Sequence, residues 1–284
     1  MLHVEKHGRV PDDEARRILR FLEECYGRLR PEALELVEIR IFDTDRLWRS
    51  QLATERRKAG VMSAEVDDAF IAVHDAWTGI SRISISLERK QGLAQLVWEG
   101  ALRHEAGHSI LHGGLEYYVF PMPKLFLEAA KEFPTLTSQL TDILYLLALA
   151  VKDMEVTKLL VSSAYVEDQA AYARFVMKPS EQDLQAWSLS SIAASARVLC
   201  AVGKLKDIAA GMVLASRPEN SHLGLEEVEE SLRYLPEEVR KSLLHTCNRI
   251  LEDLTNDTFA NIRTAGTLVV FNFIEPMMRG PTPN

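Results

Sequence analysis

The spacing of apolar residues along the chain changes near residue 92. Before that point, stretches of helical spacing alternate with stretches in which every second residue is apolar, the pattern of strands with one buried face. These patterns predict, in order, a helix over 12–27, a strand over 37–41, a polar helix over 45–58, and strands over 70–74 and 83–87. Thr78-Gly79 is a turn signal between the last two strands, so we expect a hairpin there.

From Gly92 onward the helical period dominates. Leu93, Val97 and Ala101 belong to the apolar face of a long helix, and Gly113-Gly114 ends it. Pro134 opens a strongly apolar helix that continues to about residue 161. Further helices are predicted from about 124 and over 183–203, 205–215, 224–233, 236–254 and 257–274.

These elements predict an α+β protein with two subdomains. Residues 1–115 would form a mixed α/β part with a small sheet, and residues 116–284 would form a helical part. A chain of 284 residues is long enough for two modest domains. Ligand sites favour the junction of subdomains, so the helix that ends near His112 is the place to look for chemistry.

That helix contains His104-Glu105-Ala106-Gly107-His108, an H-E-x-x-H motif. Residues four apart on a helix are rotated by only about 40° from each other, so both imidazoles project from one face. Both can then reach one Zn²⁺ at about 2.0–2.1 Å. Glu105 is rotated by about 100° from His104, too far to share the metal equally. Its position suits a general base that takes a proton from a metal-bound water.

With this motif the sequence resembles the zincin metallopeptidases, and more narrowly their gluzincin-like branch. In that fold a small twisted sheet precedes the H-E-x-x-H helix, and a later helix supplies a third, acidic ligand. The resemblance is specific for five residues and architectural over the first 160, and the remaining helices are loosely similar to uncharacterised metallopeptidases of archaeal type. It implies a zincin-like fold in which the strand over 82–88 is the sheet edge that lines the cleft, where a peptide could pair by strand addition.

A catalytic zinc site usually has three protein ligands and an open position for water. The metzincin extension is excluded, because Leu111 and Gly114 stand where that branch has Gly and His. The compact gluzincin spacing, with Glu about twenty residues downstream, is not matched either, since that zone holds Pro121, Pro123 and Glu128.

A better third ligand lies in the apolar helix, in Lys152-Asp153-Met154-Glu155-Val156-Thr157. Acidic residues in so apolar a helix are costly unless they are paired or metal-bound. The segment resembles the D-x-E-[VI]-[NT] helix of several zincins, which gives the ligand role to Asp153. Glu155 is the rival, and because the two lie about 200° apart on the helix they cannot both face one metal. Thr157 stands where gluzincins usually have an Asp that supports the site.

Other polar residues near the motif have two interpretations each. His112 continues the i, i+4 series and could be a third nitrogen ligand. Three successive ligands would spread over more than about 10 Å of helix, so we favour a polar residue at a helix C-terminus, where a cationic imidazole is stabilised. Tyr117, Tyr118 and His74 could stabilise an oxyanion or simply be packed side chains.

Composition excludes other classes of function. A net charge of −8 argues against nucleic-acid binding through a general basic field. Cys25, Cys200 and Cys247 are far apart and form no C-x-x-C pair, so we expect reduced thiols. The start lacks the apolar core of a signal peptide, and the longest apolar run, 143–151, is about half of a membrane span. We therefore expect a cytoplasmic protein without nucleic-acid or membrane partners.

Together these features predict a zinc-dependent metallopeptidase that acts on a peptide or protein substrate. Glu105 would accept a proton from water and pass it to the leaving amine. One alternative keeps the metal but not general proteolysis, as a zincin-fold binding or regulatory module. Another is a helical adaptor with an accidental motif.

Overall fold

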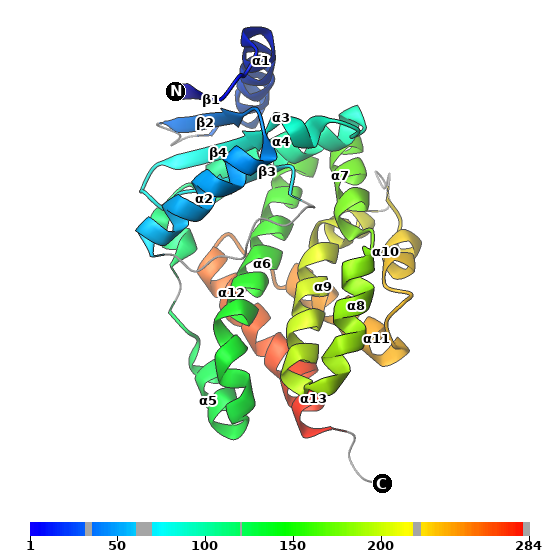
Figure 1. The fold of residues 1–284 in the computed structure, drawn as a ribbon. Coiled ribbons are helices and arrows are strands. Elements are labelled where there is room, and N and C mark those ends of the chain that lie inside the picture. The colour runs from blue at the N-terminus through cyan, green and yellow to red at the C-terminus, as the bar shows by residue number, and fades with distance from the viewer. Residues whose placement is uncertain (32–35, 61–69, 120, 218–222, 281–284) are drawn as a thin grey trace. The chain divides into compact units, whose positions relative to one another are not determined.

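A computed structural model of the chain describes residues 1–31, 36–60, 70–119, 121–217 and 223–280. Figure 1 shows its elements in chain order. The chain divides into two compact units. Unit 1 contains Met1–Phe120 and Val156–Phe175, and unit 2 contains Pro121–Glu155 and Val176–Asn284.

Unit 1 contains a four-stranded mixed sheet with the order β1-β2-β4-β3. Its strands are β1 (Leu2–His7), β2 (Val37–Phe42), β3 (Ala72–Asp75) and β4 (Ser81–Ser86). β1, β2 and β4 run parallel, and β3 pairs antiparallel with β4, which confirms the hairpin. With helices making up most of the rest, the α+β class predicted from the sequence is confirmed.

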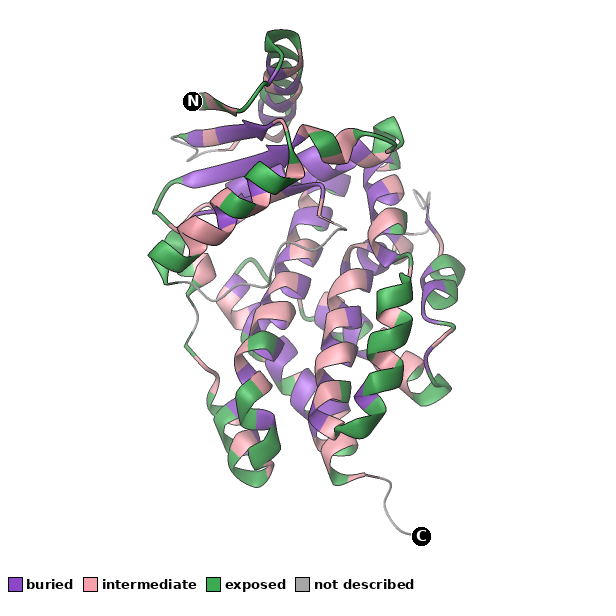
Figure 2. Cartoon of the chain, viewed as in Figure 1, coloured by how far each residue is buried: buried purple, intermediate pink, exposed green. Residues whose placement is uncertain are grey.

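The expected sheet edge is corrected by the strand order. The resemblance implied that the strand over 82–88 would line the cleft as an edge, but β4 pairs with β2 on one side and with β3 on the other. All six residues of β4 are buried, as in a central strand covered on both faces (Figure 2). The edge strand beside β4 is β3, which has only four residues, and natural proteins often keep edge strands short.

The helices of unit 1 are α1 (Asp12–Leu29), α2 (Asp45–Ala59), α3 (Leu87–Lys90), α4 (Gln95–Leu111), the 3₁₀ turn η1 (Leu115–Tyr118) and most of α7 (Glu167–Met177). Three of them, α1, α2 and α4, pack against this sheet, and α4 carries the motif. α4 packs against β3, β4 and α1. Ten of its residues, including the whole motif, are buried.

All secondary-structure elements among the described residues of unit 2 are helices. Its elements are α5 (Lys124–Glu132), η2 (Pro134–Gln139), α8 (Glu181–Leu189), η3 (Ser190–Ile192), α9 (Ala194–Ala215), α10 (Leu225–Ser231), α11 (Glu237–Glu252), α12 (Thr258–Val269), the π-helical η5 (Val270–Ile274) and α13 (Glu275–Arg279). α6 (Leu140–Ser162) contributes residues to both units.

Two helix boundaries differ from the sequence prediction. The apolar helix predicted from Pro134 begins as a 3₁₀ turn and becomes α-helical only at Leu140. A helix break expected near Gly203 is absent, because α9 continues through this glycine and the break lies at η3 instead. A glycine inside a helix costs only about 1 kcal/mol, and the buried neighbours Val202 and Leu205 offset that cost by packing.

Two other features concern the cysteines and membrane-spanning helices. All three cysteines are free, as expected from their spacing. Across the described ranges, no helix combines the length and the apolar composition that crossing a bilayer requires.

Two glycines let α4 pack closely against neighbouring helices. A Cβ on Gly107 would lie 2.7 Å from Cγ1 of Val156 on α6. A Cβ on Gly100 would lie 2.3 Å from the main-chain oxygen of Asp168 on α7. Positions 100, 104, 107 and 108 share one face of a helix, so the two motif histidines lie on the face along which α4 makes these close approaches.

We expect Gly107→Ala to destabilise the protein by about 1–3 kcal/mol, because the added methyl overpacks the contact with Val156. The matched control is Gly27→Ala, on the exposed side of α1, where an added Cβ meets nothing within 4 Å. That control should be neutral or stabilise by up to about 1 kcal/mol. Thermal unfolding followed by circular dichroism measures both, and Val156→Ala should recover part of the Gly107→Ala loss. Equal midpoints for the two glycine variants would contradict the close approach.

Candidate metal site

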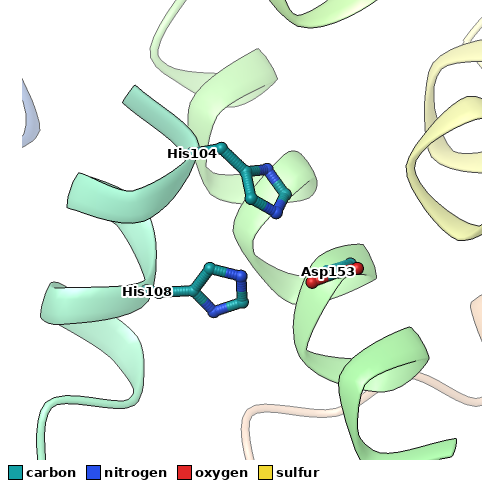
Figure 3. A group of neighbouring side chains, drawn as sticks. All are labelled: His104, His108 and Asp153. Atoms are coloured by element: carbon teal, nitrogen blue, oxygen red, sulfur yellow. The ribbon is translucent and has the colours of Figure 1, made fainter. Parts of the chain in front are cut away.

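The motif histidines and Asp153 form one group that could hold a metal ion. Each offers one ligand atom, and the three atoms lie within 4.8 Å of one another. Each histidine turns one ring nitrogen toward the other ring and toward Asp153 (Figure 3). The two ring centroids are 4.8 Å apart with an interplanar angle of 76°. The motif thus has the side-chain arrangement that its helical spacing predicts.

The position of Asp153 follows from the packing of α6. Val156, which contacts Gly107 of α4, lies three residues after Asp153 on the same helix. Residues three apart on a helix share a face. Asp153 therefore projects from the face of α6 that meets α4, one turn before the point of contact.

These three residues fit a zinc ion by chemistry and by scale. Two imidazoles and one carboxylate are a common donor set for catalytic zinc. Ligand atoms at 2.0–2.1 Å around a tetrahedral ion are about 3.3 Å apart. The spread of up to 4.8 Å would close to that value through small side-chain rotations. His104 is 4% exposed and His108 is 7% exposed, so the two imidazoles are shielded from bulk water, while Asp153 is half-buried.

Glu105 lies outside this group and is bound to the edge of the sheet. The His74 N–H on β3 donates a hydrogen bond to Oε2 of Glu105, with a length of 2.7 Å. Glu105 is 6% exposed. Its carboxylate is therefore fixed by a hydrogen bond to the main chain of β3.

His74 connects β3 to η1 through its side chain. Its Nε2 is 2.9 Å from Oγ of Ser81, and its Nδ1 is 2.6 Å from the hydroxyl of Tyr118. The hydroxyl also donates to the main-chain oxygen of His74 at 3.3 Å. The His74 ring lies parallel to that of His108, with centroids 6.2 Å apart. Of the neighbours named from the sequence, His74 and Tyr118 thus form one hydrogen-bonded pair beside the motif.

A buried ion pair anchors the end of β3. Nε of Arg82 donates to Oδ1 of Asp75 at 3.0 Å, and Asp75 has no exposed surface. Nη1 of Arg82 also lies 3.1 Å from a carboxylate oxygen of Glu55 on α2. Burial raises the pKa of the Asp75 carboxyl, although Arg82 opposes the rise. These contacts hold the residue next to His74, and so help to fix the strand that positions Glu105.

Glu155, the rival third ligand, is engaged elsewhere. Its carboxylate accepts hydrogen bonds from the Thr258 hydroxyl at 2.8 Å and from Nδ2 of Asn261 at 2.6 Å, both on α12. It is absent from the metal-binding group found among the described residues. The cost of this acidic residue in an apolar helix is offset by these two hydrogen bonds from α12.

Three other sequence candidates, His112, Tyr117 and Thr157, also lie outside the group. His112 is fully buried at the C-terminal cap of α4, and its Nδ1 is 3.2 Å from Nδ1 of His108. Tyr117 packs the edge of its ring against that of His112. Thr157 is 1% exposed, and its hydroxyl makes no hydrogen bond within the described part of the chain. Of these, His112 contacts a member of the group, His108.

Asp153 also interacts with a cation on α9. Burial lowers the pKa of the Lys206 ammonium, but the carboxylates of Asp207 and Asp153 more than offset this effect, so that pKa lies above its ordinary value. Nζ of Lys206 is 3.4 Å from Oδ1 of Asp207. A bound metal would therefore compete with Lys206 for the Asp153 carboxylate.

No family model, no curated protein and no solved structure matches this chain. The function is therefore inferred from the geometry and chemistry of these residues.

Asp153→Asn and Glu155→Gln test which of the two carboxylates binds the metal. We expect Asp153→Asn to weaken zinc binding by more than the roughly 10–100-fold typical of residues outside the ligand set. It should also lower the unfolding midpoint, because the buried Lys206 ammonium loses a neighbouring carboxylate. Glu155→Gln should keep zinc affinity and lower the midpoint, because its bonds to α12 are weakened. Chelator competition and thermal unfolding measure the two quantities. Loss of zinc affinity in Glu155→Gln, with zinc affinity retained in Asp153→Asn, would assign the metal to Glu155.

Proposed function

We propose that this protein is a zinc-dependent metallopeptidase with a zincin-like site, in which Glu105 is the general base. The observation that carries the proposal is the convergence of His104, His108 and Asp153, with Glu105 next to them on α4. An accidental motif on an adaptor helix would not need a carboxylate from a helix 45 positions later in the sequence. The antiparallel edge strand against α4 supports the zincin-like fold.

In this proposal the protein residues divide into holding and proton-transfer roles. His104, His108 and Asp153 hold the ion and leave it one net positive charge. Bound zinc would polarise the substrate carbonyl and increase the acidity of a water at its open position. Glu105, oriented by the His74 N–H, accepts the proton of the attacking water and delivers it to the leaving amine. Burial of the histidines keeps this charge transfer out of bulk solvent.

One observation favours a narrower activity than general proteolysis. Strand addition needs free main-chain groups along an edge strand. At His74 of β3, the N–H is bonded to Glu105 and the carbonyl accepts from Tyr118. An extended polypeptide would have to displace these contacts. The second candidate function is accordingly a metal-binding module, or an enzyme for short substrates, without broad protease activity.

We expect Glu105→Gln to reduce cleavage of a mixed peptide library by roughly 10²–10⁴-fold, because the amide cannot accept the proton. Zinc content should stay unchanged, since the amide oxygen can still accept from the His74 N–H and the ligand residues are intact. Mass spectrometry of library products and elemental analysis of the purified protein measure the two effects.

Chelation supplies the matched control. Removing zinc should abolish cleavage by the wild type, and adding zinc should restore it. Retained cleavage in Glu105→Gln would refute the base assignment. Stable zinc binding by the wild type with no cleavage of any library member would select the binding module instead.

A further inference from the structure

His112 is the one histidine at the motif that neither the metal group nor the proposed proton transfer uses. It has no exposed surface, and its Nδ1 lies 3.2 Å from Nδ1 of His108. Two nitrogens at this distance form a hydrogen bond only when one carries a hydrogen and the other a lone pair. When both rings are neutral, the tautomer of one ring therefore fixes the tautomer of the other.

The direction of this hydrogen bond follows from the metal site. His108 turns one ring nitrogen toward His104 and Asp153 (Figure 3), and Nδ1 is engaged with His112, so the nitrogen that faces the group is Nε2. A ligand nitrogen must offer a lone pair, and a neutral imidazole has one N–H. The hydrogen of His108 is then on Nδ1 and is donated to His112. The hydrogen of His112 must be on Nε2.

We propose that His112 is a positioning residue of the metal site: it accepts the Nδ1–H of His108 and thereby holds the ring and the tautomer in which Nε2 faces the metal. This inference rests on the metal centre proposed above. Metal-binding histidines usually donate their second N–H to a carboxylate, a carbonyl or a water. Here a neutral imidazole takes that role, so the support adds no negative charge beside the ion.

The local backbone explains why His112 supports the site and does not join it. α4 ends at Leu111, and His112 leaves helical geometry with φ −131° and ψ 28°. Its ring meets the His108 ring at 48°, with centroids 5.4 Å apart. Tyr117 of η1 packs edge-on against its ring, with centroids 5.2 Å apart. The imidazole is thus enclosed on the Nδ1 side of His108, opposite the nitrogen that faces Asp153.

The test compares zinc affinity in three variants of the full chain by chelator competition. His112→Leu replaces the imidazole with an apolar side chain of similar size and removes the hydrogen-bond acceptor. We expect zinc affinity to fall roughly 10–100-fold. His112→Asn places an amide oxygen near the position of Nδ1, and it should restore most of that loss. His245→Leu, at an exposed position of α11, is the matched control and should bind zinc like the wild type.

The outcomes separate this inference from the metal centre on which it rests. Wild-type affinity in His112→Leu, or an equal loss in His112→Leu and His112→Asn, would overturn the positioning role and leave the metal centre standing. No zinc binding by the wild type would overturn both.

A second measurement does not depend on any variant folding. Nitrogen NMR of the zinc-loaded wild type should find His108 with its hydrogen on Nδ1 and His112 with its hydrogen on Nε2. His112 with a hydrogen on Nδ1 would overturn the proposal.

Discussion

The arrangement of the site depends on the close approach of α4 to its neighbouring helices. Gly107 lets Val156 of α6 come within contact distance of the α4 backbone, and Gly100 does the same for α7. A larger residue at either position would push these helices apart. The histidines lie on the same face of α4, so the helix that approaches at Gly107 also carries the carboxylate to them. The two glycines thus set how closely the helices approach, and this distance determines the geometry of the candidate metal site.

Neighbouring acidic residues take separate roles because different elements bind them. Glu105 is one position from His104, yet its carboxylate is bound by the β3 main chain. Glu155 is two positions from Asp153, yet it bonds to α12. In each pair one residue belongs to the metal-binding group, and specific hydrogen bonds engage the carboxylate of the other. Such bonding offsets the cost of burying carboxylates and leaves Asp153 as the acidic member of the group.

Features that depend on the local spacing of residues along the chain could be predicted from the sequence. Features that depend on how helices pack against one another could not. The apolar periods predicted α1, β2 and the β3–β4 hairpin, and H-E-x-x-H predicted two imidazoles on one face. β1 was missed, because its exposed edge position leaves no buried face to detect. The choice between Asp153 and Glu155 depends on the rotation of α6 against α4. The contact of His112 with His108 depends on how the backbone turns after α4 ends.

X-ray absorption spectroscopy of the zinc-loaded protein tests the central claim most directly. The account predicts one zinc per chain in a shell of nitrogen and oxygen at about 2.0–2.1 Å, with the outer scattering of two imidazoles and no sulfur. The imidazole scattering should disappear when His104 and His108 are both replaced by alanine. A protein that retains no zinc after dialysis, or a zinc shell without imidazole, would contradict the account.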